Sequence, residues 1–252
     1  LDPSSVERVV SERDGDVDAI LAVHLYGCPA EMDRLGDIAA RHDIPLVEDA
    51  AQAHGARYRG DVVGSIGDVG CFSFYPTKNM TTGEGGAVVT DRDDVAERVD
   101  RFVDHGRSDE GGYRVVGHNF RMSDVLAAIG REQLENLEEY VAARRDTASR
   151  YTRALAGGDG GVTPPVEPED GRHAYHQYTV RCPDRDAFRR HLAGHDVDTS
   201  VYYERPIPEE SAYDDVTVSV PVAERAAAEV VSVPVHPTLS EREVNRVVTA
   251  LE

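Results

Sequence analysis

The sequence predicts an α/β fold, with a large domain built on a parallel sheet followed by a small α+β domain. In residues 1–156, short runs that are apolar throughout alternate with segments whose apolar residues recur every three to four positions. This alternation is typical of a parallel sheet with helices on both faces. A glycine cluster at 157–161, followed by Pro164 and Pro165, then marks a domain boundary. We therefore expect domains at 1–156 and 157–252.

The large domain contains four predicted helices and four predicted strands. Apolar runs place strands over 19–23, 45–49, 69–74 and 85–90. Helical spacing places helices over 3–12, 32–42, 91–105 and 124–156. In the third helix we expect Val95, Val99 and Phe102 to face inward. The last helix has no proline, and we expect it to bridge the two domains.

The small domain alternates predicted strands and helices. Strands are expected over 176–181 and 198–202, and helices over 184–192, 221–231 and 240–251. This order predicts a small α+β domain.

Composition excludes several classes of function. The formal charge of −20 disfavours a nucleic-acid or anionic-membrane surface, because such surfaces need a basic patch. There is no apolar run of membrane-spanning length and no leader-like start. Cys28, Cys71 and Cys182 lie too far apart to suggest a disulfide framework or a metal site, which favours a reducing, cytoplasmic compartment. The dispersed acids resemble the surfaces of proteins from salty cytoplasms.

Lys78 is the only lysine among 27 basic residues. Arginine stays protonated, whereas a lysine in a suitable pocket becomes a nucleophilic amine. Lys78 follows the apolar run 69–74 and precedes a glycine-rich turn at 83–86. His24, Asp49 and the segment 73–78 all follow predicted strands. Because ligands gather at the carboxyl ends of parallel strands, we expect these residues to share one crevice.

Five motifs in order make the chemistry more specific. They are VEDAAQAHG at 47–55, GSIGD at 64–68, FSFYPTKN at 72–79, GEGG at 83–86 and NFRM at 119–122. Together they resemble the DegT/DnrJ/EryC1/StrS family of sugar aminotransferases, which depend on pyridoxal 5′-phosphate (PLP), and the resemblance runs from about residue 17 to the C-terminus. The resemblance implies the type I PLP-transferase fold of the aspartate aminotransferase kind, with a large and a small domain.

The resemblance also implies roles for five residues. Lys78 matches the lysine that binds the cofactor covalently and moves the substrate proton, and Asp49 matches the carboxylate facing the pyridine nitrogen. Gln52 matches a residue near the ring substituents, and Ser73 a hydroxyl that binds the phosphate. Asn119 matches an asparagine that reaches the phosphate from a neighbouring subunit, which implies a homodimer with shared sites. The implied substrates are an amino donor, glutamate or glutamine, and a nucleotide-linked keto-sugar, as in polysaccharide biosynthesis.

Other interpretations stay open beside these. Asp49 and Asn119 also suit helix caps, and Ser73 could simply fill space in a strand. Arg121 and His24 fit a substrate pocket or a structural role equally well, and His54 fits packing better. A sugar dehydratase of the same family would have histidine in place of Lys78. The family's phosphate-binding turn and stacking aromatic precede the region matched here, so the chain resembles the family without its N-terminal part, and a non-catalytic remnant is a further alternative.

Overall fold

The computed structural model describes residues 1–13, 15–108, 110–156, 161–215 and 217–252. The chain forms two compact units, the first comprising 1–141 and 167–174 and the second 142–166 and 175–252. The boundary predicted at 156/157 adjoins 157–160, which lie outside the described residues. The compact units divide earlier, inside helix α4 (Asp124–Ala156), because Tyr151 and Leu155 are buried in the core of unit 2.

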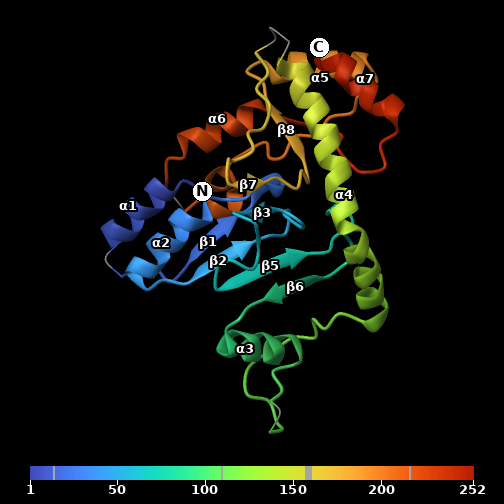
Figure 1. Cartoon of the computed structure of the whole chain (residues 1–252). Helices are drawn as coiled ribbons and strands as arrows, with labels where there is room; N and C mark the ends of the chain where they lie inside the picture. Colours follow the sequence, from blue (N-terminus) through green and yellow to red (C-terminus); the bar gives the residue numbers. More distant parts are fainter. Residues whose placement is uncertain (14, 109, 157–160, 216) are drawn as a thin grey trace. The chain divides into compact units, whose positions relative to one another are not determined.

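A four-stranded sheet organises unit 1 (Figure 1). Its order is β1 (Ile20–Val23), β2 (Leu46–Asp49), β5 (Val69–Ser73) and β6 (Gly86–Val89). The first three strands are parallel, which confirms that part of the prediction. Strand β6 is antiparallel to β5, so the sheet is mixed. A second, small sheet joins β4 (Asp61–Val62), β3 (Arg57–Tyr58) and β7 (Gly171–Arg172), and the sequence analysis missed these two-residue strands.

One face of the main sheet carries the core of unit 1. Helix α2 (Met32–His42) lies against β1 and β2, and α1 (Pro3–Arg13) packs against α2 (Figure 1). Four side chains of α2 are buried, and they recur at helical spacing: Met32, Leu35, Ile38 and Ala39. They belong to the same hydrophobic core as the inward-facing residues of the strands. Burial here follows the alternation of strand side chains, with Ile20 and Ala22 inside.

The opposite face of the sheet is open among the described residues. Leu21 is 56% exposed and Val23 40% exposed, and every residue of β6 is exposed. Helix α3 (Asp93–Val103) buries none of its residues, and Phe102 is 44% exposed. The expectations of a sheet covered on both faces and of an inward-facing Phe102 are therefore wrong for the described chain. The apolar pattern marks surfaces suited to burial, but it does not say what covers them.

Unit 2 has its own core around a two-stranded antiparallel sheet, β8 (Tyr178–Arg181) and β9 (Val230–Val233). Helices α5 (Arg185–Gly194), α6 (Pro221–Glu229) and α7 (Glu241–Leu251) belong to this unit, with 3₁₀ turns at Ile207–Glu209 and Ser211–Tyr213. The strand predicted over 198–202 is wrong, since only Ser200 forms a bridge there, to Ser232. The helix predicted to 231 ends at Glu229, because the valine-rich run that follows favours a strand. In the described chain, no helix is long and apolar enough to cross a membrane.

His54 is buried in unit 1, with 3% of its surface exposed. Its ring lies 5.3 Å from the Phe72 ring and 5.9 Å from the Phe74 ring, measured between centroids. Neither ring nitrogen makes a hydrogen bond within the described residues. Burial, aided by the charge of Lys78, lowers the pKa of His54 from 6.5 to about 4. The packing interpretation of His54 therefore fits its surroundings.

We predict that His54 makes the protein less stable in acid. The unfolded chain binds a proton at the ordinary pKa of 6.5 and the folded chain only near 4, so the free energy of unfolding falls as pH drops across this window. The full loss from this group is about 3 kcal/mol. Urea unfolding at several pH values should show a weaker pH dependence for His54→Leu than for the native chain. The exposed His118, changed to Leu, is the control, and equal slopes in all three proteins would contradict the prediction.

Gly70 lies where β5 passes the loop at 64–67. An added Cβ at Gly70 would stand 1.8 Å from the carbonyl oxygen of Gly64, which is backbone and cannot rotate away. The same loop packs against Phe72, because a Cβ on Gly64 would lie 2.4 Å from that ring. Glycine is therefore required for the loop to approach the strand.

We predict that Gly70→Ala lowers the free energy of unfolding by about 1–3 kcal/mol or more, because backbone must move to admit the methyl group. Gly36 in α2 is the matched control, since an added Cβ there meets nothing within 4 Å. Gly36→Ala should raise stability by about 0.5–1 kcal/mol through helix propensity. Chemical denaturation measures both variants, and a Gly70→Ala protein of native stability would contradict the close approach.

Candidate active site at the carboxyl edge of the sheet

The strand register brings Asp49 and Ser73 to one edge and one face of the sheet. Asp49 is the last residue of β2 and lies opposite Val23 of β1 and Cys71 of β5. Ser73 comes two residues after Cys71, so it shares that face. This face is the open one, which leaves both polar groups accessible. Ser73 Oγ accepts a long hydrogen bond, 3.4 Å, from the Tyr75 amide.

Lys78 lies in the turn region that follows β5 and is partly buried. Its amide donates to the Tyr75 carbonyl at 3.0 Å, which tightens the turn. Burial lowers the pKa of the Lys78 amine, and the nearby Asp49 carboxylate opposes that shift. Asp49 is thus close enough to the Lys78 amine to act on it electrostatically. Partial burial favours the neutral, nucleophilic form of the amine.

Asp49 also affects the pKa of the Cys71 thiol. Burial raises the pKa of the Cys71 thiol, and Asp49 raises it further. Asp49 Oδ1 accepts a hydrogen bond from the Ala51 amide at 3.0 Å, which fixes the carboxylate as the chain turns away from β2. The raised pKa favours the protonated form of the Cys71 thiol.

Gln52 is held against the turn that follows β1. Its Oε1 accepts a hydrogen bond of 2.6 Å from the amide of Tyr26, in the 3₁₀ turn Leu25–Gly27. Tyr26 has φ of 60°, a conformation that non-glycine residues rarely adopt. The side-chain amide of Gln52 is thus oriented by backbone from another strand end.

Asn119 lies apart from the other four candidates in the described interactions. It is exposed in the connection between α3 and α4, where it forms an isolated bridge with Asp104. Arg121, two residues later, forms an ion pair with Asp104. This pairing supports the structural interpretation of Arg121.

Sequence reasoning missed the role of Glu48 and left His24 undecided. Both side chains are fully buried, on the sheet face opposite Asp49. The expectation that His24 shares a crevice with Asp49 and Lys78 is therefore wrong. Glu48 Oε2 lies 3.0 Å from His24 Nε2 and accepts from the Gly64 amide at 2.7 Å, while Oε1 accepts from the amides of Ile66 and Gly67, each at 2.7 Å. The available signal was an acid at an inward position of an apolar strand, since alternation puts Glu48 and Asp49 on opposite faces.

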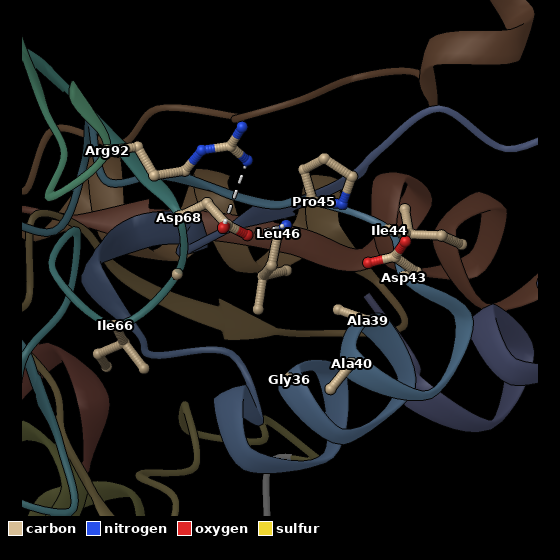
Figure 2. A pocket seen from close by; sticks show the side chains of 11 residues that line it. Gly36, Ala39, Ala40, Asp43, Ile44, Pro45, Leu46, Ile66, Asp68 and Arg92 are labelled. Atoms are coloured by element: carbon tan, nitrogen blue, oxygen red, sulfur yellow. Dashed lines mark hydrogen bonds and ion pairs between the residues drawn. The ribbon is translucent and has the colours of Figure 1, made fainter. Parts of the chain in front are cut away.

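A separate pocket of about 510 Å³ lies at the other end of the strands. Figure 2 shows it between α2 residues Ala39 and Ala40 and the pair Asp68 and Arg92, whose charged atoms are 3.7 Å apart. Leu46, the first residue of β2, lines it, so the pocket is at the amino edge of the parallel strands. It contains none of the five candidate residues.

Comparison with known proteins identifies this arrangement. The model of the DegT/DnrJ/EryC1/StrS aminotransferase family matches residues 1–252. The chain is 40% identical to EryC1, an erythromycin biosynthesis sensory transduction protein of Saccharopolyspora erythraea, across 100% of this chain and 69% of that protein. It is 40% identical to the dTDP-3-amino-3,4,6-trideoxy-α-D-glucose transaminase of Streptomyces venezuelae, across 100% and 66% of the two chains.

Solved structures agree with the sequence comparison. The crystal structure of DesV from S. venezuelae matches with a TM-score of 0.92 at 39% identity, covering all of this chain and 68% of DesV. An aminotransferase from Brucella abortus matches with a TM-score of 0.93 at 29% identity, covering 100% and 69%. The chain thus spans about two thirds of the length of its relatives. The mixed sheet with this strand order has the type I PLP-transferase fold, and the chain belongs to the DegT/DnrJ/EryC1/StrS aminotransferase family.

Proposed function

We propose that this chain acts in a PLP-dependent aminotransferase that moves an amino group from glutamate or glutamine to a nucleotide-linked keto-sugar. The observation that carries the proposal is the partly buried amine of Lys78 beside the Asp49 carboxylate at the carboxyl edge of the sheet. This edge is where α/β sheets bind ligands. The lysine disfavours the dehydratase interpretation, which needs histidine at this position.

The side chains at this edge fit PLP. The cofactor needs an amine for covalent attachment, an anion beside its ring nitrogen and hydrogen-bond donors for its phosphate. Lys78, Asp49 and the hydroxyl of Ser73 supply these groups, and all belong to unit 1. When bound, PLP supplies the electron-accepting ring that makes amino-group transfer possible.

Each residue then has a physical task. Asp49 holds the proton on the pyridine nitrogen, because a carboxylate beside that nitrogen stabilises its charged form. Lys78 Nζ would hold the cofactor covalently and would move a proton to and from the substrate carbon. The Gln52 amide, fixed by the Tyr26 backbone, orients the ring substituents. Ser73 Oγ binds the phosphate.

The names of the relatives support the substrate class. They include a dTDP-amino-sugar transaminase, a GDP-perosamine synthase of Caulobacter vibrioides and a UDP-2-acetamido-2-deoxy-3-oxo-D-glucuronate aminotransferase of Pseudomonas aeruginosa. These names share a nucleotide-linked sugar while the nucleotide differs. We therefore assign the class of acceptor and not a particular sugar. The three free cysteines support a reducing compartment, and we place the reaction in the cytoplasm.

We also propose a homodimer in which Asn119 reaches the phosphate of the partner's cofactor. Asn119 is exposed, and apolar neighbours on the same segment are exposed as well, Val116 at 88% and Phe120 at 65%. Exposed apolar residues gathered on one segment favour a protein–protein contact. A second copy of the chain would cover them and bring Asn119 to the other site.

We predict that the protein with added PLP absorbs visible light and that borohydride bleaches this band, leaving a pyridoxyl group on Lys78. Lys78→Arg, which keeps the charge but cannot attach the cofactor, should show neither band nor adduct. Because Lys78 is the only lysine, peptide mapping has a single side-chain amine to find. A folded protein without an adduct, or with one at the amino terminus, would refute the proposed function.

We predict that Lys78→Arg and Asn119→Ala proteins recover activity when they are mixed and reassembled. In a mixed dimer one site keeps both native residues, so about a quarter of all sites are intact at equal mixing. Loss of a phosphate hydrogen bond costs about 1–3 kcal/mol, so the assay should use limiting PLP. Mixing Lys78→Arg with Asp49→Ala is the control and should recover nothing, since both residues serve the same subunit's site. Recovery in neither mixture, with mixed dimers shown by mass spectrometry, would contradict the shared site.

A further inference from the structure

We infer that His24 and Glu48 form a buried clamp that positions Asp49, Gln52 and Lys78 for the cofactor. This inference rests on the proposed function. The two residues touch no ligand position themselves, because both side chains are fully buried on the far side of the sheet from Asp49. They act through the backbone segments that they join.

The Glu48 carboxylate is saturated with hydrogen bonds. Its two oxygens accept four bonds, one from the His24 ring and three from backbone amides of the loop at 64–67. Burial is the largest influence on its pKa and raises it, but the four donors together outweigh burial and hold the pKa below the ordinary value. Glu48 is therefore a buried anion, and a buried anion this well satisfied has one low-energy arrangement of its donors.

The hydrogen bonds of His24 define its tautomer. Nδ1 lies 3.0 Å from the amide of Ala30, which donates to it, so Nδ1 carries no proton. Nε2 therefore carries the ring proton and donates it to Glu48 Oε2. The clamp consists of a neutral imidazole and an anionic carboxylate, and it retains one negative charge.

Three connections lead from the clamp to the candidate site. The His24 amide donates to the Asp49 carbonyl at 3.1 Å, which fixes the end of β2. Two residues after His24, the Tyr26 amide donates to Gln52 Oε1. Third, the loop at 64–67, which donates hydrogen bonds to Glu48, packs against Gly70 and Phe72 of β5. Strand β5 leads to Lys78.

A positioning role and a merely stabilising role predict different effects on cofactor binding. If the clamp only stabilises unit 1, any variant that is folded at the assay temperature binds PLP normally. If the clamp positions the site, the loss appears in the dissociation constant of PLP even when folding is complete. A variant that restores only the donated hydrogen bond then restores binding.

The test compares Glu48→Gln, His24→Ala and His24→Gln in the protein with added PLP. Glu48→Gln replaces a carboxylate oxygen with an NH₂ group, which cannot accept from the His24 ring or from the backbone amides of the loop at 64–67. His24→Ala removes the ring N–H that donates to Glu48. His24→Gln keeps an N–H donor for Glu48. The control is Ser232→Ala, which removes a buried hydrogen bond of 2.8 Å to Thr179 in unit 2. Far-UV circular dichroism and thermal unfolding establish the folded fraction, and spectral titration gives the PLP dissociation constant.

We expect Glu48→Gln and His24→Ala to weaken PLP binding by about tenfold or more, the usual effect of removing a residue that orients binding groups without touching the ligand. His24→Gln should bind within a few-fold of native, and Ser232→Ala should bind as native does. Native affinity in folded His24→Ala, or equal weakening in the two His24 variants, overturns the inference. Failure of the native protein to form the Lys78 adduct refutes the proposed function and the clamp's role with it, whereas an adduct together with unaffected variants refutes the clamp alone.

Discussion

The buried carboxylate of Glu48 connects the end of β1 and the loop at 64–67 to strand β2. An isolated carboxylate in an apolar interior costs several kcal/mol, so its donors must remain in place for the sheet to stay folded. Those donors come from the end of β1 and from the loop before β5. One side chain on strand β2 thereby fixes the end of β1 and the loop before β5. The positions of the polar groups at the carboxyl edge of the sheet depend on these two segments.

The sheet itself is asymmetric. Its inner face packs against α1 and α2, while its outer face carries Asp49 and Ser73 together with exposed Leu21 and Val23. Polar groups that bind a ligand must stay accessible, so a candidate site on the open face is physically consistent.

Charge is arranged differently near Lys78 than over the rest of the chain. The chain has a formal charge of −20, and one lysine lies among many arginines. At Lys78, burial pushes the pKa down and Asp49 pushes it up, so the amine keeps a pKa below that of an exposed lysine while staying beside an anion. Arginine at this position would stay charged under every such balance, whereas a lysine amine can lose its proton.

The amino-acid sequence was sufficient to predict the family and the order of the main helices and most strands, because motifs and apolar periodicity are local. It also singles out Lys78, Asp49, Gln52, Ser73 and Asn119 as candidate site residues, and their roles stay predictions. It predicted α2 and α4 at their observed bounds for the same reason. The folded chain was needed to show that β6 runs antiparallel, that Phe102 is exposed and that Val230–Val233 forms a strand, since pairing and covering depend on segments distant in sequence. The partnership of His24 with Glu48 was likewise invisible in the sequence, because 24 residues separate two side chains that meet only when β1 and β2 pair.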